Sequence, residues 1–354
     1  MAEAKAGVTA PEVALAPRDA IDCDVHCAPE SMEVLLPYLD DYWRSYIDDA
    51  TIRLADLAYP PGAATSGPPG PATYDDLVPL LDRDAPRRVV LSCLVLDGVH
   101  RNPHYAAAVA TAVNEWLRDE WLARDDRLRA GLVVSTLDIP AAVAEVERLA
   151  GDDRFVQILL PVRTDVPYGN RLYHPLYEAA ERHGLQVAIH AWGRAGAAPT
   201  TTGLATTYLE DYLSNAHIAE IQVLSLVAEG VFDRFPGLGV VFAECGFGWL
   251  PSLLWRFDKD WKGVWREVPW VKERPSQYVR RHIRLTTAPA HLPRAPEEVA
   301  QVLEMVGADM LLYASDAPHD HGGSGGALLR HLGPEEADAI LRGNAAAFYR
   351  RAIA

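Results

Sequence analysis

The stretch Ile21-Asp22-Cys23-Asp24-Val25-His26 is the first of eight short apolar runs spaced along the chain. Most of these runs are nearly continuous, which is typical of parallel strands covered on both faces, because a half-exposed antiparallel strand would alternate apolar and polar residues. We therefore predict eight buried strands. The seven later runs are Val89 to Leu96, Leu132 to Leu137, Val156 to Val162, Gln186 to His190, Val240 to Glu244, Ile283 to Thr287 and Leu311 to Asp316.

The segments between these runs have helical periodicity and helix-end signals. Pro140 stands in the first turn of one predicted helix, and Gly184 follows the last turn of another. The predicted helices are Tyr105 to Arg124, Ile139 to Ala150, Leu172 to His183, Glu210 to Phe235, Trp249 to Trp261, Glu297 to Gly307 and an Ala-rich C-terminal stretch. Eight alternating strand and helix units predict a (β/α)8 TIM barrel of the α/β class.

Two irregular stretches lie outside this alternation. We expect residues 1–20 to be a flexible N-terminal arm and residues 21–354 to be a single barrel domain. Tyr59 to Pro71 is rich in Pro and Gly, so it predicts an insertion loop after the first strand, either a surface loop or a lid. A doubly wound open sheet is the alternative architecture, but no glycine-rich nucleotide-binding loop follows the first strand.

The composition restricts the class of protein and its partners. The 354 residues are 49% hydrophobic and 23% charged, as in ordinary globular proteins. The 33 Lys and Arg against 49 Asp and Glu give a net charge of −16, which makes nucleic acid or an anionic membrane surface an unexpected partner. With four Cys, no leader-like segment at the start and no apolar run of about 18 residues, we expect a cytoplasmic protein without a membrane span.

Metal-ligating side chains stand at the ends of four predicted strands. The first ends in Asp24-Val25-His26, the fifth in His190, the sixth in Glu244 and the eighth in Asp316. In a (β/α)8 barrel these ends meet at one mouth, where functional groups lie. Asp24 and His26 are two residues apart on a strand, so both can reach one metal. With His190 and Asp316 they offer two imidazoles and two carboxylates, which suit one divalent ion, Zn²⁺ or Mn²⁺.

Several motifs together resemble one enzyme family. They are residues 21–26, Val187-Ala188-Ile189-His190, Gly230-Val231-Phe232-Asp233-Arg234-Phe235-Pro236, Gly246-Phe247-Gly248-Trp249-Leu250-Pro251, Tyr313-Ala314-Ser315-Asp316-Ala317-Pro318-His319 and Gly343-Asn344-Ala345-Ala346. The chain resembles the amidohydrolase-related branch of the amidohydrolase superfamily, which includes aminocarboxymuconate-semialdehyde decarboxylase. The resemblance implies a (β/α)8 barrel, one divalent metal held by Asp24, His26, His190 and Asp316, and a homodimer.

The chain departs from the family pattern at two of the strand ends. Many members begin with His-x-His or Glu-x-His, whereas this chain has Asp24-x-His26. The decarboxylases of the branch usually place a His at the end of the sixth strand, where this chain has Glu244. The second change affects which residue can act as the acid or base of the reaction.

The resemblance leaves more than one reaction open. The main prediction is a metal-dependent, non-oxidative decarboxylase, a carboxy-lyase acting on a small aromatic or unsaturated carboxylic acid. The alternatives are a metal-dependent hydrolase of an amide, ester or lactone, possible in a biosynthetic pathway, and a barrel subunit without activity. Asp316 is the expected proton carrier, Glu244 a candidate general acid, and His217 a further candidate that projects over the mouth.

Other side chains beyond the strand ends are candidates for contact with the small-molecule substrate. Trp192 and Arg194 follow His190, His291 follows the seventh strand, and His319 follows Asp316 and can orient it. Two further groups of residues have structural interpretations. We expect Cys23 and Cys27 to be buried free thiols, and the stripe Trp249, Trp255, Trp261, Trp265 and Trp270 to serve helix packing and a subunit interface.

Overall fold

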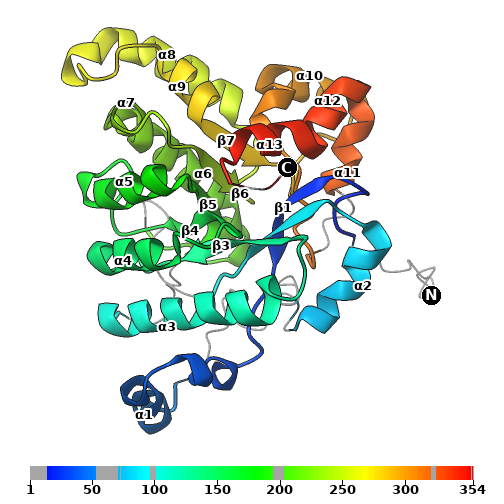
Figure 1. Ribbon diagram of the computed structural model, residues 1–354. Helices are drawn as coiled ribbons and strands as arrows, with labels where there is room; N and C mark the ends of the chain where they lie inside the picture. The colour runs from blue at the N-terminus through cyan, green and yellow to red at the C-terminus, as the bar shows by residue number, and fades with distance from the viewer. Residues whose placement is uncertain are drawn as a thin grey trace, which may run out of the picture.

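Eight parallel strands form one sheet, which lies at the centre of the computed structural model (Figure 1). The structure describes residues 14–52, 71, 73–95, 101–193, 203–319, 324–351 and 353. The strands follow one another around the sheet in chain order, and each pairs in parallel with the next. They are β1 (Ile21–His26), β2 (Arg88–Ser92), β3 (Leu128–Val133), β4 (Phe155–Arg163), β5 (Gln186–Gly193), β6 (Val240–Ala243), β7 (Ile283–Thr286) and β8 (Leu311–Leu312).

The sheet is closed by contacts between β1 and the segment that follows β8. Val25 forms an isolated parallel bridge with Ala317. The backbone N–H of Cys23 donates to Tyr313 O at 2.9 Å, and that of His26 donates to Ala317 O at 2.8 Å. The eight strands therefore form a nearly closed barrel, and the predicted (β/α)8 fold is confirmed.

Helices occupy the connections between the strands and surround the barrel (Figure 1). Their bounds are α1 (Asp41–Ala50), α2 (Tyr74–Asp84), α3 (Pro103–Trp116), α4 (Ile139–Leu149), α5 (His174–His183), α6 (Tyr208–Ala228), α7 (Val231–Arg234), α8 (Leu250–Val264), α9 (Pro275–His282), α10 (Pro296–Val306), α11 (Ser324–Ala327), α12 (Pro334–Asp338) and α13 (Asn344–Phe348). Local signals fix their ends. The Asp138 side chain caps α4, and Gly184, with φ of 67°, ends α5 as predicted.

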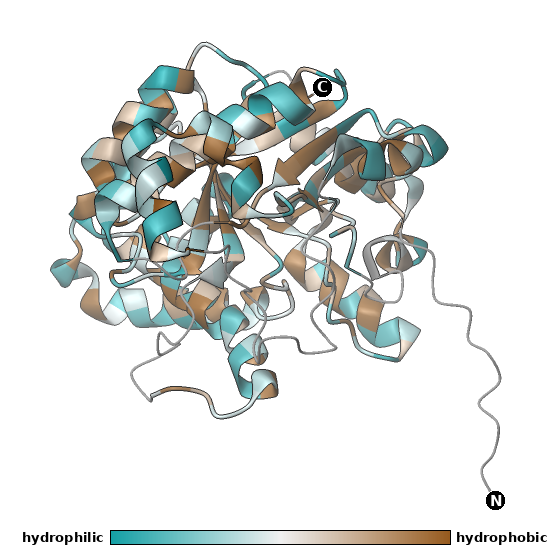
Figure 2. Cartoon of the chain, turned by 90° about the horizontal axis from the view of Figure 1, so that it is seen from below, coloured by the Kyte–Doolittle hydropathy of each residue, from teal (hydrophilic) through white to brown (hydrophobic). Residues whose placement is uncertain are grey.

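Burial follows the hydropathy of the sequence. In Figure 2 the central strands are brown, whereas the surrounding helices carry both teal and brown residues. All residues of β1, β3 and β6 are buried, as expected for strands covered on both faces. None of the helices in the described part of the chain is both long enough and apolar enough to cross a membrane.

Several predicted strand bounds differ from the structure; the second strand, for example, ends at Ser92 and not at the predicted Leu96. The third strand runs over Leu128–Val133, earlier than the predicted Leu132 to Leu137, because Leu128 pairs with Val89 of β2 and the later residues leave the sheet. The eighth strand ends at Leu312 although the run was predicted to reach Asp316, and Asp316 has a left-handed φ of 59° that an extended strand does not adopt.

The described end of the predicted N-terminal arm packs against the barrel. Leu15 and Ala16 are buried, and their backbone N–H groups donate to the carboxylates of Asp84 and Asp22, each at 2.8 Å. Residues 1–13 lie outside the described residues, as does the predicted insertion loop apart from Pro71.

The C-terminal end is held by one arginine side chain. The guanidinium of Arg351 donates hydrogen bonds to backbone carbonyls at the end of α4, around the start of β4 and at the end of α5. Its acceptors are Ala150 O at 2.9 Å, Asp152 O at 2.8 Å, Phe155 O at 3.0 Å and His183 O at 2.9 and 3.0 Å. One side chain thus satisfies carbonyls from three elements.

We predict that Arg351→Ala lowers the free energy of unfolding by about 2 kcal/mol, because it removes charge-assisted hydrogen bonds and leaves carbonyls without a partner. Urea denaturation followed by circular dichroism measures the change. Arg256→Ala is the control, since Arg256 is 84% exposed and pairs with Asp260 one turn along α8, so its loss costs about 0.5 kcal/mol or less. Equal effects of the two substitutions would contradict the prediction.

Candidate metal centre

Ionisable side chains from four strand ends meet at one mouth of the barrel. β1 supplies Asp24 and His26, β5 supplies His190, and the residues just after β6 and β8 supply Glu244 and Asp316. Four of the five are buried, with exposed fractions of 3% or less, and the Glu244 side chain is 11% exposed. The structure thus brings together the predicted ligands and the predicted acid.

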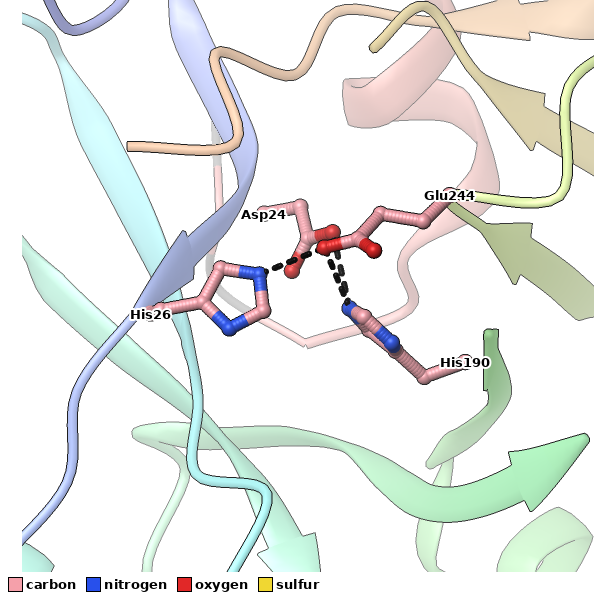
Figure 3. Close-up of side chains that lie close together, drawn as sticks. All are labelled: Asp24, His26, His190 and Glu244. Atoms are coloured by element: carbon pink, nitrogen blue, oxygen red, sulfur yellow. Dashed lines mark hydrogen bonds and ion pairs between the residues drawn. The ribbon is translucent and has the colours of Figure 1, made fainter. Parts of the chain in front are cut away.

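The two imidazoles turn their Nε2 atoms toward carboxylate oxygens (Figure 3). Nε2 of His26 lies 2.8 Å from Oε1 of Glu244 and 2.7 Å from Oδ1 of Asp316. Nε2 of His190 lies 3.1 Å from Oδ2 of Asp24 and 3.5 Å from Oε1 of Glu244. The two rings are perpendicular, with centroids 5.2 Å apart. Glu244 therefore stands between both histidines, a position that the sequence analysis did not give it.

The backbone sets the direction of the two side chains that lie beyond the strand ends. Glu244 and Asp316 have φ of 56° and 59°, a left-handed conformation that is uncommon for residues other than glycine. The N–H of Glu244 donates to Oγ1 of Thr286 at 3.1 Å, and the N–H of Asp316 donates to Asp24 O at 3.1 Å. Neighbouring strands thus hold both residues in a conformation that costs free energy on its own.

Burial and mutual charge shift the pKa values of these groups in different directions. Burial opposes protonation of His26, but its hydrogen bonds to Asp316 and Glu244 outweigh burial and raise its pKa well above the ordinary value. The pKa of His190 is also raised, since Asp24 and Glu244 outweigh burial. Burial, and then the charge of Asp316, raise the pKa of Glu244. Burial also opposes ionisation of Asp24, yet the histidines outweigh it and lower the pKa of Asp24.

Several polar groups around the cluster orient it. The Ser92 hydroxyl donates to Oδ1 of Asp24 at 2.6 Å. Nδ1 of His319, which was predicted to orient Asp316, lies 2.9 Å from Oδ1 of that carboxylate. Oδ1 of Asp22 accepts from the N–H of Ser315 at 2.9 Å and so holds the segment before Asp316. Sequence reasoning missed Ser92 and Asp22, because only strand pairing shows what they contact.

The donor set fits a divalent metal ion. Ligand atoms of Asp24, His26, His190 and Glu244 lie within 4.8 Å of one another, and a second overlapping group contains His26, Glu244, Asp316 and His319. Imidazole nitrogens and carboxylate oxygens at this density are ligands for Zn²⁺ or Mn²⁺. A cation at this point would compensate carboxylates that burial otherwise makes costly.

The remaining predicted site residues differ in position. Trp192 is buried near the end of β5, and its Nε1 has no hydrogen-bond partner among the described residues. His291 lies beyond β7, with its ring 6.4 Å from that of Tyr212. The structure does not bring His217 to the cluster, because it lies on the outer face of α6, is 73% exposed and contacts Glu220 at 3.4 Å. Arg194 lies outside the described residues.

Comparisons with known proteins agree with the fold. The γ-resorcylate decarboxylase of Rhizobium sp. (strain MTP-10005) is 25% identical over 230 residues, which cover 61% of this chain and 67% of that protein. The crystal structure of 5-carboxyvanillate decarboxylase from Sphingomonas paucimobilis is 22% identical with a TM-score of 0.68, covering 94% of this chain and 99% of that one.

A second solved structure carries a metal ion. Dihydroxybenzoic acid decarboxylase from Polaromonas sp. JS666, solved with bound manganese and the inhibitor 2-nitroresorcinol, is 19% identical with a TM-score of 0.65, covering 94% of this chain and 96% of that one. The sequence model of one family, described as amidohydrolase, matches residues 21–351. The predicted family is therefore confirmed: the chain belongs to the amidohydrolase family.

Proposed function

We propose that the protein is a metal-dependent carboxy-lyase that removes carbon dioxide from a small aromatic or unsaturated carboxylic acid. The observation that carries the proposal is the buried cluster of two imidazoles and three carboxylates at the barrel mouth. The relatives favour decarboxylation over hydrolysis, since the γ-resorcylate and 5-carboxyvanillate enzymes are both decarboxylases of aromatic acids.

Asp24, His26, His190, Glu244 and Asp316 would hold the metal. A bound cation would supply Lewis acidity, which would help to hold an anionic substrate and to stabilise the negative charge that develops when its carboxylate is lost. Three carboxylates against two imidazoles make the set rich in oxygen, which supports Mn²⁺ over Zn²⁺. We include Glu244 among the ligands because its Oε1 contacts Nε2 of both histidines.

Asp316 is the proposed proton carrier. Its Oδ1 lies 2.9 Å from Nδ1 of His319, so a proton can pass between that ring and the carboxylate, whereas Nε2 of His26, 2.7 Å away, is the nitrogen that would hold the metal. Asp316 is fully buried, which shields the proton from bulk water. Delivery of this proton to the ring carbon that loses carbon dioxide completes the replacement of the carboxylate by hydrogen.

The substrate contacts are proposed at the same mouth. Trp192 offers a buried N–H without a partner in the described part of the chain, and His319 lies beside the cluster with its ring 4.5 Å from that of His26. His291, which adjoins Tyr212, completes the proposed lining in the described part of the chain.

We further propose a homodimer in the cytoplasm. Exposed apolar side chains on α6 and α8 support an interface between two copies: Leu209, Leu213, Ile221, Trp255 and Val264. The cysteines Cys23, Cys27, Cys93 and Cys245 are all free and buried, which fits a reducing compartment and confirms the prediction for the first two.

Carbon dioxide release tests the reaction. We expect the Mn²⁺-loaded protein to release carbon dioxide from at least one member of a panel of hydroxylated aromatic and unsaturated acids. His190→Ala should abolish release by removing a ligand, whereas His183→Ala, at the far end of α5, should keep it. An amide, ester and lactone panel runs beside it in ¹⁸O-labelled water. If label appears in a product acid and no carbon dioxide is released from any acid, the protein is a hydrolase and the proposal is wrong.

We predict that the affinity of the site for a metal ion rises with pH. The raised pKa values of His26 and His190 mean that the metal-free site holds protons near neutral pH, and a metal ion must displace them. Mn²⁺ affinity should therefore rise from about pH 6 to about pH 8, with protons released on binding. Calorimetric titrations in two buffers of different ionisation enthalpy measure both quantities. A flat affinity with no proton release would contradict the prediction.

Glu244→Gln separates a ligand from a general acid. The amide keeps the size of the side chain but loses its charge, so we expect Mn²⁺ affinity to fall by about tenfold or more, with the fold intact. Equilibrium dialysis with elemental analysis measures the affinity, and His190→Ala gives the reference for a lost ligand. If affinity stays within about twofold of wild type while turnover is lost, Glu244 is an acid and not a ligand.

A further inference from the structure

The first turns of α6 are anchored to the end of β4 by a charged contact. Arg163, the last residue of β4, is 10% exposed and its Nη1 lies 2.6 Å from Oδ1 of Asp211. Its other guanidinium nitrogens donate to the Asp211 carbonyl at 2.7 Å and to Oδ1 of Asn215 at 2.9 and 3.1 Å. Two successive turns of α6 are thus fixed against the strand next to β5, which carries His190.

Tyr212, the residue after Asp211, contacts the loop that follows β7. Its ring packs edge-on against His291, which follows β7, with centroids 6.4 Å apart. His291 in turn adjoins Gly246, where an added Cβ would lie 3.1 Å from Nδ1 of His291. Gly246 is two residues beyond Glu244. The start of α6 therefore reaches from β4 to the loop after β7 through Tyr212, and His291 of that loop adjoins the loop after β6.

The environment of Tyr212 makes its hydroxyl a hydrogen-bond donor. Burial raises the pKa of Tyr212, and the negative charges of Glu244 and Asp316 raise it further, so the phenol stays protonated. Among the described residues, none forms a hydrogen bond with this hydroxyl. Tyr208, one turn earlier, stacks on Tyr212 with centroids 5.6 Å apart and extends the aromatic surface.

We propose that Tyr212 is a specificity-determining residue whose hydroxyl donates a hydrogen bond to an oxygen substituent on the substrate's ring. The inference rests on the proposed function, because it assumes an acid bound at the metal centre. It assigns to Tyr212 the place over the mouth that the sequence analysis gave to His217. His217 lies five residues later on α6 and is turned to solvent by the same anchor that turns Tyr212 inward.

The test compares two probes that differ only in ring oxygens, 2,6-dihydroxybenzoate and benzoate, titrated into Mn²⁺-loaded protein by calorimetry. We expect Tyr212→Phe to weaken binding of 2,6-dihydroxybenzoate by about fivefold, the size of one net hydrogen bond, and to leave benzoate within about twofold. Tyr208→Phe removes a hydroxyl one turn away and should leave both affinities within about twofold. Manganese content and melting temperature, measured on each variant, should match wild type.

The outcomes distinguish the inference from the function on which it rests. If wild type binds 2,6-dihydroxybenzoate and Tyr212→Phe binds it equally well, the role of Tyr212 is overturned and the proposed function stands. If Tyr208→Phe produces the same selective loss, the assignment to Tyr212 is also overturned. If wild type binds neither probe and releases no carbon dioxide from the acid panel, the proposed function fails and the inference fails with it.

Discussion

The structure depends on burying five ionisable side chains against one another at one end of the barrel. Asp24, His26, His190, Glu244 and Asp316 leave water almost completely, and most of the strand residues beneath them are apolar. Burial of an isolated carboxylate is costly, so each must find its partner within the group. The strand ends therefore have to meet within hydrogen-bond distance, and the closed barrel is what brings β1, β5, β6 and β8 to one place.

The surroundings fix the cluster as firmly as the strands do. Ser92 holds Asp24, Thr286 holds the backbone of Glu244, and Asp22 holds the residue before Asp316. Each of these contacts comes from a strand next to the one that carries the ligand. Glu244 and Asp316 keep their left-handed backbone because such contacts offset its cost. A site built in this way has its donors in place before any ligand arrives, which is the arrangement that binding and catalysis require.

The sequence was sufficient for the fold, the family and the members of the cluster, because apolar runs that end in ligands follow directly from barrel geometry. It was not sufficient where tertiary contacts determine the bounds of a strand or the direction of a side chain. The apolar residues after Val133 look like strand in one dimension, yet pairing with β2 uses the residues from Leu128. Which face of α6 turns inward depends on Arg163, far away in sequence, so Tyr212 could not be preferred over His217. Glu244 was recognised as a departure, but only the distances to His26 and His190 place it between them.

That departure changes the charge that a substrate meets. With all three carboxylates ionised (−3), both imidazoles neutral and a divalent cation bound (+2), the proposed centre would carry a net charge of −1; with a histidine in place of Glu244 it would be neutral. A carboxylate of the proposed substrate would therefore bind against one excess negative charge. Donors without charge of their own relieve that repulsion without competing for the metal, and neutral N–H and O–H groups close to the mouth, from Trp192 and Tyr212, are of this kind. The uncharged donors near the mouth would thus partly offset the repulsion that the carboxylate at residue 244 adds.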